Sequence, residues 1–331
     1  MKADDLKSAL TAQLNIPEAP SFGINHHLLF LGSCFAENIG TKMAHLGFDT
    51  LVNPFGIIYN PVSLTNMVER IVQKHTYSTQ DLFFFNGIFH SLEHHGTFAD
   101  KSAENLVDKI QQRIEKAEDF LKKTDTVMVT LGTAFAHVLE QKNAIVANCH
   151  KLPSREFLKR LLTENEIDES LEKMVHFFKK SNPNIEIVFT ISPVKHLREG
   201  ILENSLSKAR LLSALFRFID RTNDPKMGYF PAFEIVTEEL RDYRYYEPDL
   251  AHPSQWTILY IFRKFLECKL TPRAKEYIEL AVKFARMNAH KPMSIDPEEI
   301  NKWEKSKADF WGKLKLEFPD KNWETVTFEP L

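Results

Sequence analysis

Short apolar runs alternate with longer amphipathic segments between residues 27 and 266. The runs contain few charged residues and are bounded by glycine or turn residues, which is typical of buried strands in a parallel sheet. They fall at residues 27–31, 48–52, 126–131, 186–191 and 229–236, and Pro231 in the last run favours an edge strand or a shorter strand. Apolar residues at helical spacing occupy residues 34–46, 61–74, 104–123, 169–180, 204–220 and 256–266. This alternation predicts an α/β fold with helices on both faces of a parallel sheet.

Two segments depart from the alternation. Residues 83–95 are predicted to form a short hairpin, because Asn86-Gly87 is a common pair in tight hairpin turns. Residues 270–331 contain two charged helical segments, 272–287 and 297–316, with no strand between them. We therefore predict an α/β domain over residues 1–268 and a helical extension over residues 269–331 that packs on it.

Composition and charge narrow the classes of partner. The 42 Lys and Arg residues against 45 Asp and Glu give a net charge of −3, so no overall basic field favours nucleic acid or an anionic membrane. Only 11 Gly residues disfavour Gly-rich nucleotide loops, and 26 Phe residues indicate an aromatic core. Three Cys residues are too few for a disulfide framework and indicate free thiols in a reducing compartment. Without a signal-peptide pattern or a membrane-length apolar run, the sequence predicts a cytoplasmic protein.

Candidate chemistry lies just after the predicted strands, where parallel sheets bind their ligands. The first strand ends in Gly32-Ser33-Cys34, and Cys34 opens the helix that follows. Amide groups and the dipole at a helix start stabilise a thiolate, so Cys34 is a candidate nucleophile, with Ser33 on the same turn. The alternative is that Cys34 is a small buried apolar residue.

A second candidate group is the loop that follows the last strand. Asp249 precedes His252 by three residues, and a carboxylate at that distance can accept the imidazole Nδ1–H and orient the ring. Nε2 then faces a nucleophile as a general base. The spacing alone is common in surface loops, and its value comes from a position near the end of the first strand.

These segments resemble a known family. Gly-Ser-Cys-Phe-Ala at residues 32–36 is similar to the motif that names the GSCFA family, and the resemblance extends over residues 25–267 through segments 53–61, 147–151, 192–194, 240–244 and 249–253. The family is grouped with the SGNH (GDSL-type) hydrolases. The resemblance implies a flavodoxin-like three-layer α/β/α fold and an esterase-like site.

The superfamily pattern assigns roles to residues of this chain. Asp249 and His252 match its Asp-x-x-His-Pro block, which supplies the orienting acid and the base. Gly32 matches the glycine of its Gly-Asp-Ser block, so that Ser33 stands at the aspartate and Cys34 at the nucleophilic serine.

One position departs from the pattern. Residues Gly132, Thr133 and Ala134 resemble the Gly-x-Asn-Asp block, but Ala134 stands where an asparagine donates to the oxyanion. Loss of such a donor costs roughly 10²–10³ in turnover. Replacement donors in this chain are the Cys34 and Gly56 amides and the side chains of Asn60 and Asn148.

The histidines offer two further readings. His90, His94 and His95 lie close enough in sequence to suggest a metal site, but beyond Glu93 nothing completes a tetrahedral set at standard spacing. Lining of a substrate cleft by His95 is the preferred interpretation. The sequence therefore predicts no metal and no cofactor.

The sequence predicts an acyl-ester hydrolase that uses Cys34, or Ser33, with His252 and Asp249. Its substrate would be an acyl ester of a small molecule or a carbohydrate. One alternative is an acyltransferase that uses a thioester or ester donor. An alternative of another class is a non-catalytic carbohydrate- or acyl-binding protein on the same scaffold. The sequence leaves the acyl group, the acceptor and the oligomeric state open.

Overall fold

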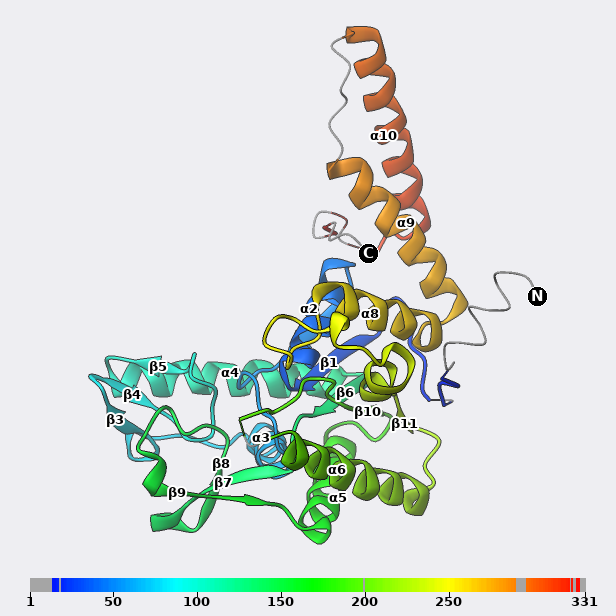
Figure 1. Ribbon diagram of the computed structural model, residues 1–331. Coiled ribbons are helices and arrows are strands. Elements are labelled where there is room, and N and C mark those ends of the chain that lie inside the picture. The colour runs from blue at the N-terminus through cyan, green and yellow to red at the C-terminus, as the bar shows by residue number, and fades with distance from the viewer. Residues whose placement is uncertain are drawn as a thin grey trace, which may run out of the picture.

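The computed structural model describes residues 14–17, 19–198, 200–289, 296–321, 323, 326 and 327. Its centre is a five-stranded sheet in the order β11-β10-β6-β1-β2, with all four strand pairs parallel (Figure 1). The strands are β1 His27–Gly32, β2 Asp49–Val52, β6 Thr126–Leu131, β10 Glu186–Ile191 and β11 Met227–Tyr229. The predicted α/β fold with a parallel sheet is confirmed.

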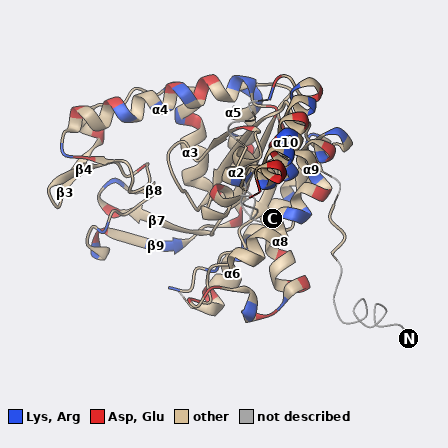
Figure 2. Ribbon diagram, turned by 90° about the horizontal axis from the view of Figure 1, so that it is seen from above, with Lys and Arg blue, Asp and Glu red and all other residues tan. Residues whose placement is uncertain are grey.

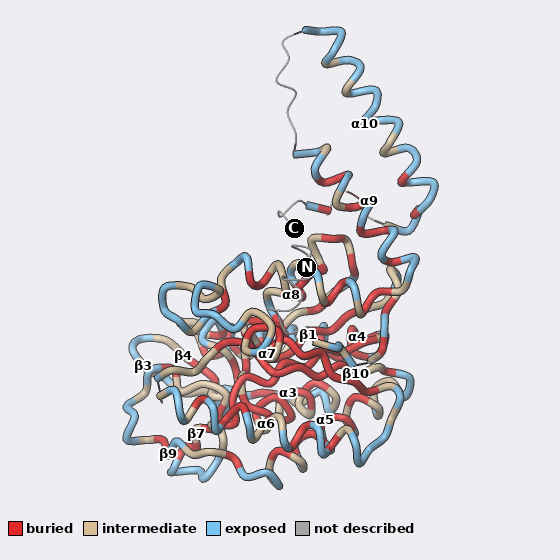
Figure 3. The backbone as a smooth tube through the Cα atoms, turned by 45° about the vertical axis from the view of Figure 1, so that its right-hand side comes forward, coloured by how far each residue is buried: buried red, intermediate tan, exposed pale blue. Residues whose placement is uncertain are grey.

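Helices cover both faces of this sheet, and alternate strand residues separate into two cores. Leu29 and Leu31 of β1 pack into one core, while Leu28 and Phe30 pack into the other. The two cores appear as the buried centre of Figure 3. The first core is completed by α3 Pro61–Val72, α4 Ala103–Lys123, α5 Glu164–Ser181 and α6 Ile201–Thr222. The second is completed by α2 Cys34–His45, α8 Gln255–Lys269 and α9 Pro272–Ala289.

Two small antiparallel sheets interrupt the alternation of strands and helices. The predicted hairpin is confirmed: Asn86 and Gly87 join β3 Phe83–Phe85 to β4 Ile88–His90, both with positive φ. The short β5 Ala99–Asp100 extends this sheet. The second small sheet, which sequence reasoning missed, has the order β8-β7-β9. Its strands are β7 Phe135–Leu139, β8 Ala144–Val146 and β9 Phe157–Leu161, the last with basic residues marked blue in Figure 2.

The last predicted strand, at 229–236, is the shorter edge strand that Pro231 suggested: β11 lies at the edge of the sheet and ends at Tyr229, so the prediction is wrong only beyond that residue. After Pro231 the chain forms the short helical turn α7 Ala232–Glu234 and then a π-helical turn over Ile235–Leu240. The Pro231 carbonyl accepts from the Ile235 amide at 2.9 Å, and this bond starts the turn. Ile235 is buried in the second core. An apolar run of this length does not distinguish a strand from a buried helical turn.

The last two long helices extend away from the sheet (Figure 1). Tyr277 of α9 is buried, donates to the Leu46 carbonyl at 2.8 Å and packs its ring edge-on against Phe48 at 5.9 Å. Helix α10 Pro297–Glu317 is mostly exposed, with Leu314 as its buried residue (Figure 3). The division of the chain at residues 268 and 269 stays a prediction.

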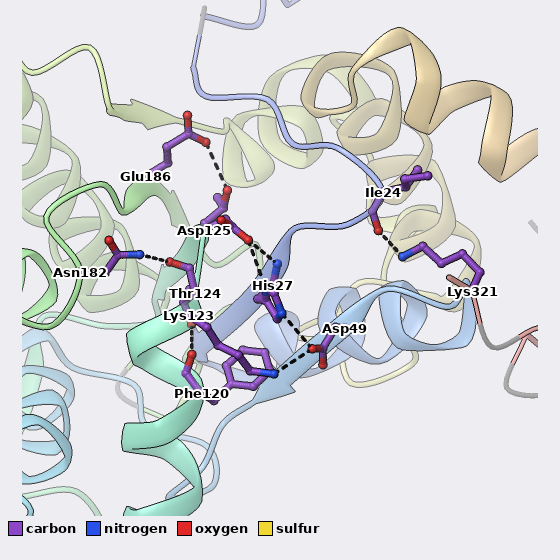
Figure 4. Close-up of polar contacts among 11 residues, drawn as sticks. Ile24, His27, Asp49, Phe120, Lys123, Thr124, Asp125, Asn182, Glu186 and Lys321 are labelled. Carbon is purple, nitrogen blue, oxygen red and sulfur yellow. Dashed lines mark hydrogen bonds and ion pairs between the residues drawn. The ribbon is translucent and has the colours of Figure 1, made fainter. Parts of the chain in front are cut away.

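Polar contacts hold the amino ends of the strands together (Figure 4). The His27 amide donates to Asp125 Oδ2 at 2.8 Å, and the His27 ring lies between Asp125 at 3.1 Å and Asp49 at 3.5 Å. Lys123 Nζ adds an ion pair to Asp49 at 3.2 Å. The Glu186 amide donates to the Asp125 carbonyl at 2.8 Å. These contacts lie at the starts of β1, β2, β6 and β10. They are therefore at the end of the sheet opposite to the carboxyl ends of the strands, where parallel sheets bind their ligands.

Replacing Gly32 tests how tightly the end of β1 is packed. Gly32 has φ +125°, and an added Cβ would lie 2.1 Å from the Thr130 carbonyl oxygen. We expect Gly32→Ala to lower the free energy of unfolding by roughly 3 kcal/mol or more, measured by urea denaturation. In the control Gly96→Ala, the new methyl group meets nothing within 4 Å, and a change within about 0.5 kcal/mol is expected. Equal effects of the two substitutions would contradict this account.

Candidate functional site

A pocket of about 730 Å³ opens at the carboxyl end of the parallel sheet. Its walls come from the start of α2, the loop after β2, the β8-β7-β9 sheet, the segment after β10 and the loop before α8. The structure thereby brings together five residues predicted from sequence, which are Cys34, Asn60, Thr133, Asp249 and His252. Segments separated by more than 200 residues thus share one cavity.

The turn after β1 separates the roles of the two candidate nucleophiles. Ser33 is the N-cap of α2: it is 1% exposed, and its Oγ accepts from the Phe35 amide at 3.2 Å. Cys34, the first residue of the helix, is half-buried and lines the pocket. A hydroxyl that caps a helix satisfies an otherwise unpaired amide. Cys34 is therefore the nucleophile candidate that reaches the cavity.

The thiol of Cys34 is not activated at rest. Burial raises its pKa above the ordinary thiol value, and the Glu37 carboxylate adds to this effect. The amides of Cys34 and Phe35 and the charge of Lys208 act in the opposite direction without reversing it. The expectation of a thiolate stabilised by the helix start needs correction, because desolvation outweighs the helix-terminal amides here. Cys34 needs a base to become a nucleophile.

The loop before α8 presents such a base. His252 Nδ1 donates to Asp249 Oδ2 at 2.6 Å, while Asp249 Oδ1 accepts from the amides of Ala251 and His252 at 2.9 and 3.0 Å. These bonds lower the pKa of Asp249 to about 2, so it remains an anion at neutral pH. The Asp249 bond to Nδ1 leaves His252 Nε2 as the proton acceptor.

The position of this loop follows from backbone bonds rather than from burial. The Lys195 amide, just after β10, donates to the Ala251 carbonyl at 2.9 Å, and the Ser254 amide donates to the Tyr245 carbonyl at 2.9 Å. The His252 side chain is 54% exposed. The base therefore stands at the open edge of the pocket, whereas the nucleophile lies deeper.

The loop after β2 contains two of the predicted oxyanion donors. The Asn60 side chain keeps one N–H for a ligand, whereas the Gly56 amide is already bonded within its own turn. Asn60 caps α3 through Oδ1, which accepts from the Ser63 amide at 2.8 Å, and its Nδ2 donates to Ser63 Oγ at 3.0 Å. Because Nδ2 carries two protons, the second N–H can serve a ligand in the pocket that Asn60 lines. The Gly56 amide instead donates to the Asn53 carbonyl at 2.7 Å within its own turn.

The segment after β6 is held by bonds to the same loop. The amides of Gly132 and Thr133 donate to the Tyr59 carbonyl at 2.8 and 3.2 Å. Thr133 Oγ1 lies 3.0 Å from Ser207 Oγ, which also accepts from the Ala134 amide at 2.8 Å. Thr133 lines the pocket, while the Gly132 backbone sits behind it. Ala134 itself has no side-chain donor, so any replacement for the expected asparagine must come from another residue.

The other predicted lining residues lie elsewhere. His95 packs under Gly56, and its amide donates to the Phe55 carbonyl at 2.9 Å. Asn148 Oδ1 accepts from the His150 amide at 2.9 Å in the loop after β8. Neither residue is part of the pocket wall as the described chain forms it.

The histidines considered for a metal are packed as aromatic rings. His94 is buried and stacks on Phe55 with ring centres 4.1 Å apart, and burial lowers its pKa to about 3. His90 stacks on Phe83 at 5.4 Å and contacts His150 at 4.8 Å. Over the described ranges, no group of three or more His, Cys, Asp or Glu residues is arranged to hold a metal ion.

Sequence reasoning missed several residues of the site. Lys208 of α6 is fully buried, and its Nζ donates to the carbonyls of Gly132 and Ser192 at 2.6 and 2.8 Å. Burial lowers the pKa of Lys208 to about 7. His196 lines the pocket edge-on to Tyr59, and burial lowers its pKa to about 3, so it is neutral. A lysine inside an amphipathic helix gives no sequence signal of such burial.

The comparison with family models agrees with the sequence motifs. Residues 27–265 match the family model described as the GSCFA family. Among solved structures, the chain is similar to an acetyl xylan esterase (Est2A) from the rumen bacterium Butyrivibrio proteoclasticus, at 12% identity and a TM-score of 0.38. The similarity covers 77% of this chain and 64% of the esterase chain, so this chain spans less than two thirds of that protein. No curated protein matches the chain.

No helix in the described part of the chain combines the length and the apolar character needed to cross a membrane.

The protonation state of Cys34 can be measured by alkylation. Because burial raises the pKa of Cys34, its reaction with iodoacetamide should still increase with pH above about 8.5, where an exposed thiol is half ionised. Removing the nearby carboxylate in Glu37→Gln should move the midpoint down, because the Glu37 charge raises the pKa of Cys34. Peptide mass spectrometry between pH 6 and pH 10 resolves Cys34 from the other two cysteines.

The control is Glu299→Gln, which removes another exposed carboxylate from the first turn of a helix, in α10 and outside the pocket wall. It should leave the Cys34 profile unchanged. An alkylation rate that has already reached its plateau by pH 6–7 would support the original prediction that the helix start stabilises a Cys34 thiolate.

Proposed function

The chain belongs to the GSCFA family, and we propose that it hydrolyses acyl esters through a thiol nucleophile, Cys34, with His252 as base and Asp249 as the orienting acid. The observation that carries the proposal is that all three residues line one pocket, with the His252 ring held by a 2.6 Å bond to Asp249. Three groups in these roles are the requirement for nucleophilic acyl chemistry.

In the first half of the proposed reaction, His252 Nε2 takes the Cys34 Sγ proton as the sulfur attacks the ester carbonyl carbon. The resulting imidazolium is stabilised by the Asp249 carboxylate. The tetrahedral intermediate collapses when His252 returns the proton to the departing alkoxide, which leaves as an alcohol. The acyl group remains on Cys34 as a thioester.

In the second half, water attacks the thioester carbonyl and gives its proton to His252. Collapse of this intermediate releases the carboxylic acid, and the proton on His252 restores the Cys34 thiol. An acceptor hydroxyl or amine in place of water would make the same intermediate an acyl donor. Product analysis therefore distinguishes hydrolysis from acyl transfer.

Two groups are proposed to bind the oxyanion. The Cys34 amide lies in the first turn of α2, where helix amides have no acceptor within the helix. The second is the remaining N–H of Asn60, which replaces the donor absent at Ala134. Both come from elements whose backbone is fixed at the end of β1 and in the loop after β2. Donors held in place before the reaction cost no reorganisation during it.

Substitution at the three positions tests the nucleophile. With para-nitrophenyl acetate, we expect Cys34→Ala and His252→Ala to lower kcat by roughly 10³-fold or more. Ser33→Ala is the matched control: it should lower the free energy of unfolding by about 1 kcal/mol through the lost cap and keep kcat within roughly twofold. Loss of turnover in Ser33→Ala alone would overturn the assignment of Cys34. Absence of turnover in every protein, the wild type included, would favour a binding protein.

Asn60→Asp tests the oxyanion donor while keeping the helix cap. Aspartate caps a helix as well as asparagine does, so the free energy of unfolding should change by no more than about 0.5 kcal/mol. The carboxylate cannot donate, and kcat should fall by roughly 10²–10³-fold. Ser102→Ala removes the cap of α4 far from the pocket and should show the reverse pattern, with lower stability and normal kcat. An active Asn60→Asp variant would exclude this donor.

A further inference from the structure

We propose that the alcohol half of the ester substrate carries a further hydroxyl group, as esters of glycerol and of sugars do, and that His196 and Tyr59 bind this hydroxyl. The inference rests on the proposed ester hydrolysis at Cys34, because it names the class of alcohol that the same pocket would release.

His196 brings a buried nitrogen without a partner to the pocket. The residue lies in the segment after β10, its ring lines the pocket, and Nε2 is buried with no hydrogen-bond partner among the described residues. The His196 amide donates to Asn204 Oδ1 of α6 at 2.9 Å, which holds the backbone that carries the ring. A buried polar atom that stays unpaired is unfavourable, and native structures pair nearly all of them. A ligand in the pocket is the partner that this ring can reach.

Tyr59 brings a hydroxyl to the same part of the pocket. It lines the pocket from the loop after β2, and its ring meets the His196 ring edge-on with centres 5.3 Å apart. Its carbonyl accepts from the Gly132 amide, and its side chain packs against Gly132, where an added Cβ would lie 3.1 Å from Tyr59 Cβ. Within the described ranges, no hydrogen bond engages the Tyr59 hydroxyl. The ring is therefore held while its hydroxyl stays available.

Both groups are uncharged at neutral pH. Burial raises the pKa of Tyr59, and the charges of Cys34 and Glu37 raise it further, so the hydroxyl keeps its proton. Burial lowers the pKa of His196 to about 3, so its ring has one nitrogen that donates and one that accepts. A phenol also both donates and accepts. A hydroxyl group matches this pair because it does the same, whereas a carboxylate only accepts and an ammonium only donates.

The electrostatic surroundings of the pair indicate the alcohol side of the ester. His252 is among the charges that add to the effect of burial on the pKa of His196, and Cys34 adds to that of burial on Tyr59. The pair therefore lies within electrostatic range of both the proposed base and the proposed nucleophile. In the proposed reaction the departing oxygen must lie beside His252 Nε2 to receive its proton. A hydroxyl next to that oxygen is the part of the substrate that His196 and Tyr59 would meet.

Three acetate esters test the inference. Glycerol 1-acetate and 2-methylbutyl acetate have the same shape, with each hydroxyl of the first replaced by a methyl group in the second. The third ester, methyl 6-O-acetylglucopyranoside, carries its hydroxyls on a sugar ring. For each ester, acetate release is followed at constant pH, and kcat/KM is divided by the rate of uncatalysed hydrolysis.

We expect the wild type to prefer a hydroxylated ester over 2-methylbutyl acetate by roughly tenfold or more, because the apolar isostere would leave both polar groups unpaired. Burial of apolar surface alone would favour 2-methylbutyl acetate, so the sign of the preference is itself informative. The better of the two hydroxylated esters distinguishes a sugar from an open-chain polyol. Equal rates, or a preference for the apolar ester over both others, would overturn the inference.

Two variants assign the preference to the pair. Tyr59→Phe removes the hydroxyl and keeps the ring, and His196→Phe removes both nitrogens and keeps a ring against Tyr59. Each should lower the ratio of hydroxylated to apolar kcat/KM by roughly threefold or more, whereas a loss of folded protein would lower both rates alike. Tyr243→Phe is the matched control, because Tyr243 is 53% exposed and lies outside the pocket wall. A ratio that persists in both pocket variants, or falls as far in the control, would contradict the inference.

Failure of the proposed function can be separated from failure of the hydroxyl site. If the wild type hydrolyses any of the three esters, ester hydrolysis stands, and the ratios alone decide on the hydroxyl site. If it hydrolyses none, the proposed function fails, and saturation-transfer NMR with glycerol 1-acetate decides on the site. Transfer that is lost in Tyr59→Phe and kept in Tyr243→Phe supports the site. Equal transfer in both variants, or none in the wild type, rejects it.

Discussion

The site depends on one buried lysine that joins the ends of two neighbouring strands. Lys208 Nζ donates to the Gly132 carbonyl after β6 and to the Ser192 carbonyl after β10, and the lysine is 1% exposed. A buried lysine is tolerated when polar groups replace its water, and here the two carbonyls do so, while burial lowers its pKa to about 7. Because the chain continues from these points into Thr133 and Val194, both in the pocket wall, Lys208 fixes the base of the cavity.

The proposed nucleophile and the proposed base are held by different kinds of structure. The loop after β2 is bonded to the end of β1, where the Ile58 amide donates to the Gly32 carbonyl at 3.0 Å, and to the end of β6 through the Tyr59 carbonyl. Cys34 and Asn60 therefore belong to the rigid part of the molecule. His252 stands on an exposed loop instead. A desolvated thiol resists ionisation and oxidation. Under the proposed mechanism, Cys34 therefore reacts only when its base and its substrate are both in place.

The sequence predicts the parts of this structure that depend on local pattern. The strands at 126–131 and 186–191 are found with their observed bounds, since they are largely apolar and almost entirely buried. Cys34, His252 and Asp249 are selected because strand ends and family motifs mark them, and the structure places all three in one pocket. The β8-β7-β9 sheet is missed because its strands are short and Lys159 and Arg160 give β9 a polar pattern. Lys208 is missed because its partners are backbone carbonyls, which no residue type identifies.

The β8-β7-β9 sheet is an insertion in the α/β fold, and its two ends lie close together. It follows β6 directly and returns to α5, and the Leu162 amide closes its base by donating to the Ala134 carbonyl at 2.8 Å. The core strands do not depend on the residues at its tip. An insertion attached in this way can change in length and charge without displacing the strand ends that position Cys34, so the wall of the pocket and the proposed catalytic residues can vary independently of one another.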